Sequence, residues 1–304
     1  GRINMNMTNT DGVSKDVFEL LEEKRDKASK SHKKIADFIL EHYDKASYLT
    51  AARLGECVGV SESTVVRFAY ELGFDGYPML QRALREATKN KLTAVQRIEV
   101  SLDRLKGSDV FTKVLQNDIE HIRQTIEETA SSSFEAAVDS IVRAKNIYIM
   151  GIRSSAALAS FMGYYFKLMM LNVQIVQTGS RSELYEQLLR IGSDDLLIGI
   201  SFPRYSKQTV TALAYAHEKG ADSIAITDSI DSPAASYAKN VLLARSDMVS
   251  FVDSLVAPLS LINALIVAVS TRNYSAVSES FKALEEIWEE YDVYEKNGEQ
   301  NVRE

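Results

Sequence analysis

Residues 59–81 read GVSESTVVRFAYELGFDGYPMLQ. Gly59 can take a positive φ that a β-branched residue cannot, which predicts a turn at that position. Ser61 follows as a natural N-cap, and Gly73 is a typical stop signal after the last turn of a helix. The pattern predicts a helix over 62–72 that buries Val65, Phe68, Ala69 and Leu72.

The chain before this stretch supplies a partner helix. Residues 50–57 place Ala51 and Leu54 on one side, and residues 30–43 form an amphipathic pattern. A short helix, a glycine turn and a second helix are typical of a DNA-binding helix-turn-helix. An ordinary helical hairpin with a glycine turn is the alternative interpretation.

Small hydroxyl residues gather on the outward face of the helix over 62–72. They allow the backbone to approach DNA closely, and an arginine two turns into the helix can reach a base edge or a phosphate. We therefore predict that the DNA contacts are Ser61, Ser63, Thr64 and Arg67.

The charge distribution separates the first third of the chain from the rest. The chain has a net charge of −7, but residues 1–90 contain 14 basic and 14 acidic residues, which leaves 21 and 28 for residues 91–304. Six basic residues lie between Lys24 and Lys34, where Asp26 is the single acid. This cluster is either a solvated helix surface or a contact with nucleic-acid phosphates.

The first ninety residues resemble the N-terminal domain of RpiR-type (MurR/RpiR) bacterial transcription regulators. The most specific matches are Val60-Ser61, Thr64-Val65, Arg67-Phe68, Leu72-Gly73-Phe74 and Gly76-Tyr77. The resemblance implies that the helix beginning near Ser61 reads the major groove. We expect Phe74 and Tyr77 to pack the next helix onto the hairpin.

Length and composition predict about two globular domains in 304 residues, with 45% hydrophobic and 25% charged residues. We predict a helix-turn-helix domain at 14–90, a helical linker at 91–132 and an α/β domain at 133–304. Ser132 and Glu135 have the spacing of a capping box for the helix after the linker. Cys57 is the only cysteine, so no internal disulfide is possible, and we expect neither a metal site nor a cofactor.

The sequence also suggests a location in the cell. The longest apolar stretch, residues 255–269, is too short to span a membrane, and the first ten residues lack the apolar block of a signal peptide. We expect a cytoplasmic protein.

Apolar runs alternate with helical patterns from residue 134 onward. The predicted strands are 146–150, 173–176, 196–200, 223–227 and 241–243. Five short apolar strands separated by helices predict a parallel sheet covered on both faces, with ligands bound beyond the carboxyl ends of the strands. The predicted fold is thus an all-α helix-turn-helix domain followed by an α/β domain with a five-stranded parallel sheet flanked by helices.

The loops after these strands combine hydroxyl residues with arginines. A helix N-terminus carries about half a positive charge, and serine hydroxyls with a guanidinium can complete a phosphate site. Neither GxGxxG nor GxxxxGK[ST] is present, so a dinucleotide or P-loop site lacks support. The predicted ligand-binding residues are Gly151, Arg153, Ser154, Ser155, Ser180, Glu183, Ser201, Arg204, Tyr205 and Ser206. Simple helix capping is the alternative for Ser154, Ser155 and the Ser180–Glu183 pair.

Residues 134–270 resemble the sugar isomerase (SIS) domain, which binds phosphosugars through serines of the first and third strand loops. The usual third-loop pattern is Ser-x-Ser-Gly-x-Thr-x-Glu. Here Ser201 is followed by Pro203, Arg204, Ser206 and Gln208 at the later positions. The first loop has Arg153 where a second glycine is common. The two added cations suggest an acidic sugar or a phosphorylated ligand held more electrostatically.

These features predict a transcription regulator that binds double-stranded operator DNA and responds to a phosphosugar, as a homodimer or homotetramer. The helical pattern at 275–296, with apolar residues at heptad-like spacing, could pack on its own domain or form a dimer contact. A phosphosugar isomerase, deaminase or lyase is the alternative, with Glu183 as its only serious base because Gln208 cannot transfer a proton. A sugar-phosphate sensor that acts through protein contacts is a third hypothesis.

Overall fold

The computed structural model describes residues 17–294 apart from 90–91, 106, 108, 171 and 247–251. The chain forms two compact units that divide between Asp109 and Val110, and a short piece around Val252 joins the first. The predicted linker over 91–132 is shared between them, because its first helix belongs to the first unit and its second helix to the second. The expected domain start at residue 14 and the tail residues 295–296 lie outside the described residues.

The first unit is helical in its described residues. Its elements are α1 (Val17–Arg25), α2 (Lys30–Glu41), α3 (Tyr43–Ala46), α4 (Ala51–Val58), α5 (Glu62–Glu71), α6 (Tyr77–Lys89) and α7 (Ala94–Leu105).

The turn between α4 and α5 confirms the expected local signals. Gly59 adopts the left-handed conformation, with φ of 73°, and ends α4. The Ser61 hydroxyl accepts a hydrogen bond from the backbone N–H of Thr64 at 3.3 Å and so caps α5. Behind this face, Val65, Phe68 and Ala69 are buried against α2 and α4, as the helical period requires.

Helix α6 is held against the helix-turn-helix of α4 and α5 by Tyr77, which is 4% exposed. Its phenol donates a hydrogen bond to the Leu49 carbonyl at 2.8 Å, and Gln81 donates to the same oxygen at 2.5 Å. Burial raises the pKa of Tyr77 to about 12, so the phenol remains a neutral donor into the alkaline range above pH 10. Tyr77 is therefore a core residue, as predicted, and Phe74 packs against the same core.

The second unit alternates strands and helices after an initial helical pair. Its elements are α8 (Val110–Glu128), α9 (Ser131–Arg143), β1 (Ile147–Gly151), α10 (Ser154–Met169), β2 (Val173–Val176), α11 (Arg181–Gln187), β3 (Leu196–Ile200), α12 (Lys207–Glu218), β4 (Asp222–Thr227), η1 (Ala235–Tyr237), β5 (Asn240–Leu243), α13 (Val256–Arg272) and α14 (Tyr274–Glu290).

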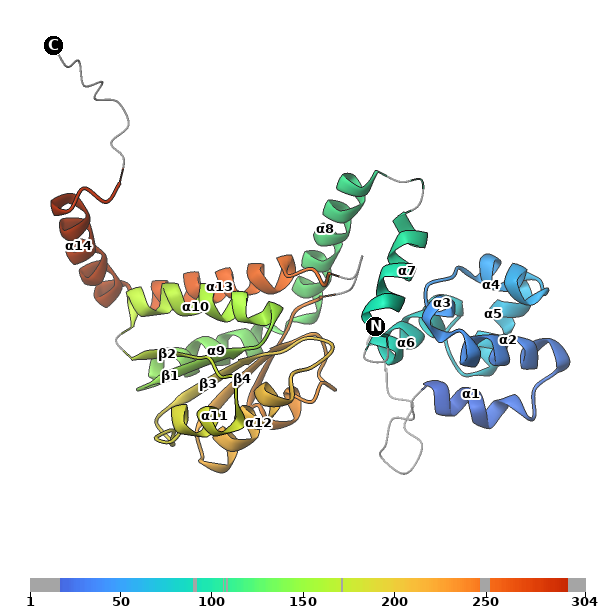
Figure 1. Cartoon of the computed structure of the whole chain (residues 1–304), viewed down its shortest axis with the longest axis horizontal. Helices are drawn as coiled ribbons and strands as arrows, with labels where there is room; N and C mark the ends of the chain where they lie inside the picture. The colour runs from blue at the N-terminus through green and yellow to red at the C-terminus, as the bar shows by residue number, and fades with distance from the viewer. Residues whose placement is uncertain are drawn as a thin grey trace, which may run out of the picture. The chain divides into compact units, whose positions relative to one another are not determined.

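The five strands form one parallel sheet in the order β2-β1-β3-β4-β5. One face carries Ile147, Ile149 and Ile198 and packs against α9, α10 and α13. The other face carries Tyr148, Met150 and Leu197 and packs against α11 and α12. Figure 1 shows α10 and α13 on one side of the sheet and α11 and α12 on the other. The predicted strands and layers are confirmed.

Helix α9 differs from its predicted start. It begins at Ser131 behind Ala130, which provides no side-chain cap, so the predicted capping box of Ser132 and Glu135 is wrong. Ser132 lies inside the first turn, where its hydroxyl is not in the N-cap position.

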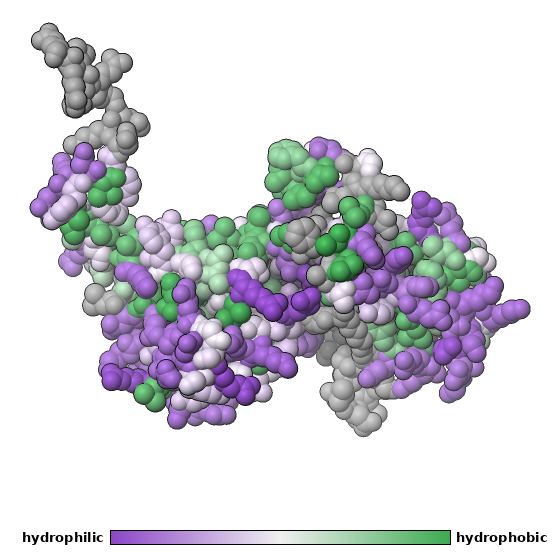
Figure 2. Space-filling model, viewed as in Figure 1, coloured by the Kyte–Doolittle hydropathy of each residue, from purple (hydrophilic) through white to green (hydrophobic). Residues whose placement is uncertain are grey.

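The apolar side of α8 is largely uncovered in the described residues. Val110, Ile119 and Ile126 are more than half exposed, whereas His121 and Thr125 are buried. Figure 2 shows hydrophobic residues gathered at the N-terminal end of this helix. Helix α14 packs Val277 and Phe281 against its own domain and leaves Tyr291 exposed.

No single helix among the described residues is long and apolar enough to cross a membrane. Helices α13 and α14 meet the length and composition criteria only as a pair, and they are bent by 99° with respect to each other. Buried residues of α13, such as Ile262 and Leu265, belong to the core of the second unit.

Candidate functional site

The N-cap and first two turns of α5 carry a connected group of polar side chains, of which Ser61, Ser63 and Arg67 are exposed and Thr64 is half-buried. The Ser61 hydroxyl lies 2.9 Å from that of Ser63 and 2.8 Å from that of Thr64. Arg67 donates a longer hydrogen bond, 3.4 Å, to the Thr64 hydroxyl. The structure thus brings the four predicted DNA contacts together on one outward surface, which we call the hydroxyl–arginine face.

This face has the chemistry that duplex DNA requires. Hydroxyls donate to phosphates or base edges, and a guanidinium supplies a bidentate donor for guanine in the major groove. The Arg67 side chain is exposed, so reaching DNA requires no rearrangement of the core. Nearby Arg53 of α4 is also exposed, but it is paired with Glu56 at 2.7 Å.

The basic cluster of residues 24–34 is used in two ways. Lys24 donates to the Glu71 carbonyl at 2.5 Å, and Arg25 pairs with Asp37, so these two stabilise the fold of the unit. Lys30, Lys33 and Lys34 of α2 are exposed. Lys24 and Arg25 therefore fit neither interpretation of the cluster, and the three exposed lysines fit both.

In the second unit, the strand order defines where a ligand can bind. Chain connections run in opposite directions from β1 and β3, so the sheet has a topological switch point between these two strands. Gly151 pairs in register with Ile200, which places the β1–α10 and β3–α12 loops side by side at the carboxyl edge. A crevice at such a point is where ligands of open parallel sheets bind.

The β3–α12 loop is held together by two serines. The buried Ser201 hydroxyl accepts a hydrogen bond from the backbone N–H of Ser206 at 3.2 Å. The Ser206 hydroxyl caps α12 by accepting from the N–H of Thr209 at 3.4 Å. The structure therefore brings Ser201 and Ser206 together at the N-terminus of a 12-residue helix.

Tyr205 and Arg204 of this loop differ in their surroundings. The Tyr205 phenol donates to the buried Asp228 carboxylate at 2.8 Å, which ties this loop to the one after β4. Arg204 is exposed. Tyr205 is thus engaged within the protein, whereas Arg204 is oriented to solvent.

The β1–α10 loop contains a second set of predicted residues. A Cβ on Gly151 would lie 2.3 Å from the Ser155 carbonyl oxygen, so close packing of strand and helix by itself requires this glycine. Arg153 has φ of 57° and ψ of −122°, a conformation that glycine adopts far more readily. Ser154 is exposed and Ser155 is buried, so only the first is open to solvent.

Ser180 and Glu183 form the capping arrangement that was the alternative for them. The Ser180 hydroxyl accepts from the N–H of Glu183 at 3.2 Å, and the Glu183 carboxylate accepts from the N–H of Gly179 at 2.8 Å. Both side chains are committed to the start of α11.

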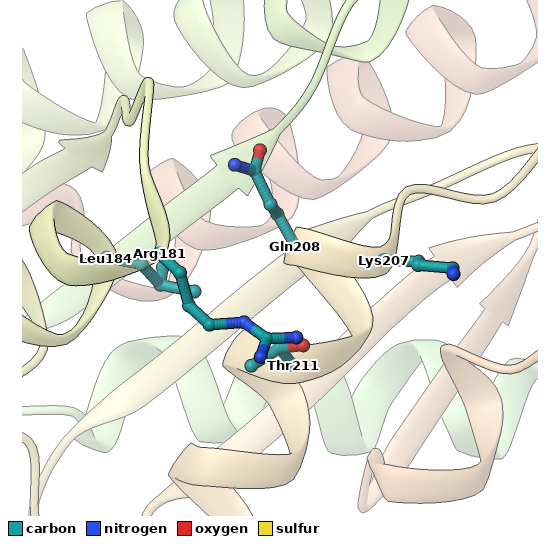
Figure 3. A pocket seen from close by; sticks show the side chains of 5 residues that line it. All are labelled: Arg181, Leu184, Lys207, Gln208 and Thr211. Carbon is teal, nitrogen blue, oxygen red and sulfur yellow. The ribbon is translucent and has the colours of Figure 1, made fainter.

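The structure adds residues that the sequence did not single out as ligand-binding. A hollow between α11 and α12 is lined by Arg181, Leu184, Lys207, Gln208 and Thr211 (Figure 3). Lys207 and Gln208 directly follow Ser206, so the hollow adjoins the β3–α12 loop. The arginine next to a capping serine was the available signal, but Thr211, which lines the same hollow, lies on another helix.

Comparison with known proteins adds independent observations. The model of the rpiR-family helix-turn-helix domain matches residues 15–91, and the SIS domain model matches residues 140–268. An uncharacterized HTH-type transcriptional regulator of Haemophilus influenzae is 30% identical over 221 residues, which are 71% of this chain and 75% of that protein. The HTH-type transcriptional regulator HexR of Pseudomonas aeruginosa is 25% identical over 214 residues, which are 70% of this chain and 73% of that protein.

Solved structures agree with this picture. The sugar isomerase domain of the RpiR transcription factor from Sphaerobacter thermophilus is 32% identical, with a TM-score of 0.56, and covers 58% of this chain and 98% of its own. The Vibrio vulnificus NanR protein, complexed with ManNAc-6P, is 20% identical, with a TM-score of 0.56, and covers 90% of this chain and 97% of its own.

Proposed function

Because the chain belongs to the rpiR family of helix-turn-helix transcriptional regulators and carries an SIS domain, we propose that it binds operator DNA through α5 and that a phosphorylated sugar in the second unit modulates this affinity. One observation carries the ligand half of the proposal. The Ser201–Ser206 pair lies at the switch point of the sheet, at a helix N-terminus that is suited to a phosphate. That NanR was solved with ManNAc-6P supports a phosphosugar as the class of ligand.

Modulation requires that the ligand bind one state of the protein more tightly than the other. Helix α8 is suited to transmit such a difference, because it opens the second unit and is tied to the region after β5. The backbone N–H of Arg245 donates to the Thr125 hydroxyl at 2.9 Å, and Ser254 donates to Asp118 at 2.6 Å. A ligand-dependent shift at the carboxyl edge would therefore act on the helix that follows the DNA-binding unit in the chain.

We propose that the protein acts without catalysis. An isomerase needs an acid or base that is free to move a proton at the sugar carbonyl. Glu183 is held by the N–H of Gly179, and Gln208 cannot transfer a proton. Turnover of a hexose phosphate that is lost in Glu183→Gln would contradict this part of the proposal.

Operator binding by helix-turn-helix proteins favours a symmetric oligomer. Two recognition helices of a dimer enter successive major grooves roughly 34 Å apart. We therefore propose a homodimer or homotetramer, in which the exposed apolar residues of α8 and α14 provide surface to bury. Light scattering coupled to size exclusion tests the assembly, and a monomer at micromolar concentration that still binds a two-fold operator would contradict it.

The direct test uses the full-length chain and a randomised duplex library. Selection should enrich a sequence with two related half-sites, and anisotropy should then measure its affinity with and without a panel of sugar phosphates. At least one sugar phosphate should change the affinity about fivefold or more, while the unphosphorylated sugars and inorganic phosphate should not. If selection enriches no sequence, the DNA half is wrong, and if no sugar phosphate changes the affinity, the ligand half is wrong.

A further inference from the structure

The last residue of α5, Glu71, is in contact with side chains of α1 and α2. Its carboxylate oxygen Oε2 lies 2.5 Å from Nδ1 of His32, which is in the first turn of α2. Its backbone carbonyl accepts a hydrogen bond of 2.5 Å from the Lys24 ammonium of α1. The His32 ring also packs on Phe68, with the ring centroids 5.4 Å apart. The C-terminal end of α5 is therefore held by two neighbouring helices.

The two members of the His32–Glu71 contact differ in their freedom to move. The His32 side chain is 13% exposed, and its Nδ1 atom is shielded from solvent without a directed hydrogen bond. The Glu71 side chain is 52% exposed, so its carboxylate can leave the contact without disturbing the core. Because no directed hydrogen bond joins the two groups, the attraction between them depends on the charge of the imidazole.

The charge of the His32 imidazole is subject to opposing influences. Imidazole is the side chain whose charge ordinarily changes between pH 5 and 8. The Glu71 carboxylate favours the positive form, whereas the Lys24 ammonium and the positive N-terminal end of α2 oppose it. Among the described residues, no other acid lies at ion-pairing distance from His32. Charged pairs on the neighbouring helices include Arg25 with Asp37 and Arg53 with Glu56, and α3 adds Asp44 and Lys45 at the other end of α2.

Arg67 offers the Glu71 carboxylate a second partner. The two residues are four positions apart on α5, and side chains at this spacing are neighbours on one face of a helix. Arg67 is exposed, donates to Thr64, and forms no ion pair in the region that the structure describes. A carboxylate that leaves His32 can therefore turn to Arg67 and occupy the guanidinium that is expected to contact DNA.

We propose that Glu71 is a switch on the hydroxyl–arginine face and that the protonation of His32 controls it. The imidazolium holds the carboxylate at α2 and leaves Arg67 free for the operator. The neutral imidazole releases the carboxylate, which then pairs with Arg67 and also repels the DNA phosphates. Operator affinity is therefore higher at mildly acidic pH and falls as the pH rises. The inference rests on the proposed function, because it requires that Arg67 contact DNA.

The test measures the operator affinity of the full-length chain by anisotropy at pH 6 and pH 8, at constant ionic strength. The unaltered chain should bind about threefold or more tightly at pH 6, since an exposed ion pair shifts an equilibrium by a few fold. Glu71→Gln removes the competing carboxylate, so its affinity at pH 8 should rise to the value that the unaltered chain reaches at pH 6. His32→Gln cannot become charged, so its affinity should stay low at both pH values.

The double variant His32→Gln/Glu71→Gln separates a switch from a contact that only supports α5. A switch predicts that loss of the carboxylate restores high affinity in the absence of the imidazole. A purely supporting contact predicts binding at least as weak as in His32→Gln. Denaturant titrations at both pH values establish that each variant is folded, and Glu71→Gln alone decides the question if His32→Gln is unstable.

The matched control is His42→Gln. It removes another imidazole of the first unit, which is exposed and packs on Phe38 with ring centroids 4.9 Å apart. This variant should keep the pH response of the unaltered chain, which separates His32 from the general gain of positive charge at acidic pH.

Three results overturn the inference and leave the proposed function standing. They are equal operator affinity of the unaltered chain at the two pH values, weaker binding by Glu71→Gln at pH 8, and a full pH response in His32→Gln. Failure of the proposed function has a different signature. The unaltered chain would then bind no selected operator at either pH value, and the inference would fall with it.

Discussion

In the first unit, α5 begins behind Ser61, whose hydroxyl accepts from the N–H of Thr64 at 3.3 Å. In the second unit, α12 begins behind Ser206, whose hydroxyl accepts from the N–H of Thr209 at 3.4 Å. The two helix starts therefore have the same local chemistry: a serine N-cap, unpaired backbone N–H groups behind it, and the positive end of the helix dipole.

Their surroundings differ. The hydroxyl–arginine face of α5 is exposed, and Arg67 already donates to Thr64. The start of α12 adjoins a sheet edge, where Ser201 is only 2% exposed and the cations of the neighbouring loops lack ion-pair partners among the described residues. An exposed helix can enter a DNA groove, whereas a half-buried start at a sheet edge suits a small anion. The same cap thus supports two kinds of recognition, and the environment selects between them.

The variant with the largest expected effect is Arg67→Ala, which removes the guanidinium from the hydroxyl–arginine face. We expect operator affinity to fall about 10–100-fold, because one bidentate base contact contributes roughly 1–3 kcal/mol of discrimination. The exposed side chain makes no core contact, so the melting temperature should hardly change. Anisotropy on the selected operator measures the effect.

The control for Arg67→Ala is Arg53→Ala, which removes an exposed arginine of α4 that is paired with Glu56. It should weaken binding by only a few fold. If both variants lose equal operator affinity, Arg67 contributes only general electrostatic attraction to DNA, and α5 is not the element that reads the base sequence.

The second variant, Ser201→Ala, tests the half-buried helix start. It removes the acceptor for the N–H of Ser206, and we expect at least a tenfold loss of sugar-phosphate affinity with operator affinity unchanged. Calorimetry measures the first quantity and anisotropy the second. The control is Ser229→Ala, because Ser229 accepts from the N–H of Asp231 in the loop after β4 at 3.1 Å. A full response to ligand in Ser201→Ala would place the phosphate elsewhere.

The fold could be predicted from the sequence where the signals are local. The strands are short and bounded by polar residues, and the central strands β1, β3 and β4 are buried along nearly their whole length, so each observed strand lies within one residue of its prediction. Helices α5, α11 and α12 start behind serines that the sequence marked as caps or as hydroxyls at helix starts. Helix α9 was placed wrongly because three serines in succession offer three candidate caps, and none of them is used.

The site could be predicted only in part, for a related reason. Ser201 and Ser206 are five residues apart, so one loop brings them together. Arg181 and Thr211 lie on different helices, and their proximity depends on how α11 and α12 pack on the sheet. No periodicity in the sequence encodes that distance. Likewise, the sequence predicted a helical linker over 91–132, but not the exposure of apolar residues such as Ile126 on α8.

A third variant examines how the two regions are linked. Thr125→Val keeps the shape of the side chain but removes the acceptor for the buried N–H of Arg245. We expect the unit to lose about 1–2 kcal/mol of stability, and the effect of the sugar phosphate on operator affinity to shrink about threefold. Thr271→Val is the control, since that hydroxyl bonds within its own helix to Val267. An unaltered ligand effect with reduced stability would show that α8 supports the fold without transmitting the signal.

The smallest effect expected at neutral pH comes from Tyr77→Phe, which tests what holds the hydroxyl–arginine face in place. The Leu49 carbonyl keeps its bond from Gln81, so the loss of unfolding free energy should be about 0.5–1.5 kcal/mol at pH 7.

The pH dependence of the unfolding free energy is a more specific test of the buried phenol. Burial raises the pKa of Tyr77 from 10.0 to about 12, so the folded protein retains a proton that the unfolded chain releases. Stability from this group is present below pH 10 and is lost between pH 10 and 12, by roughly 2–3 kcal/mol. Denaturant titrations across this range should show a steeper decline for the unaltered chain than for Tyr77→Phe, while the exposed control Tyr70→Phe keeps the steeper decline. Parallel curves for the unaltered chain and Tyr77→Phe would mean that the phenol is solvated, and that α6 supports the hydroxyl–arginine face through apolar packing alone.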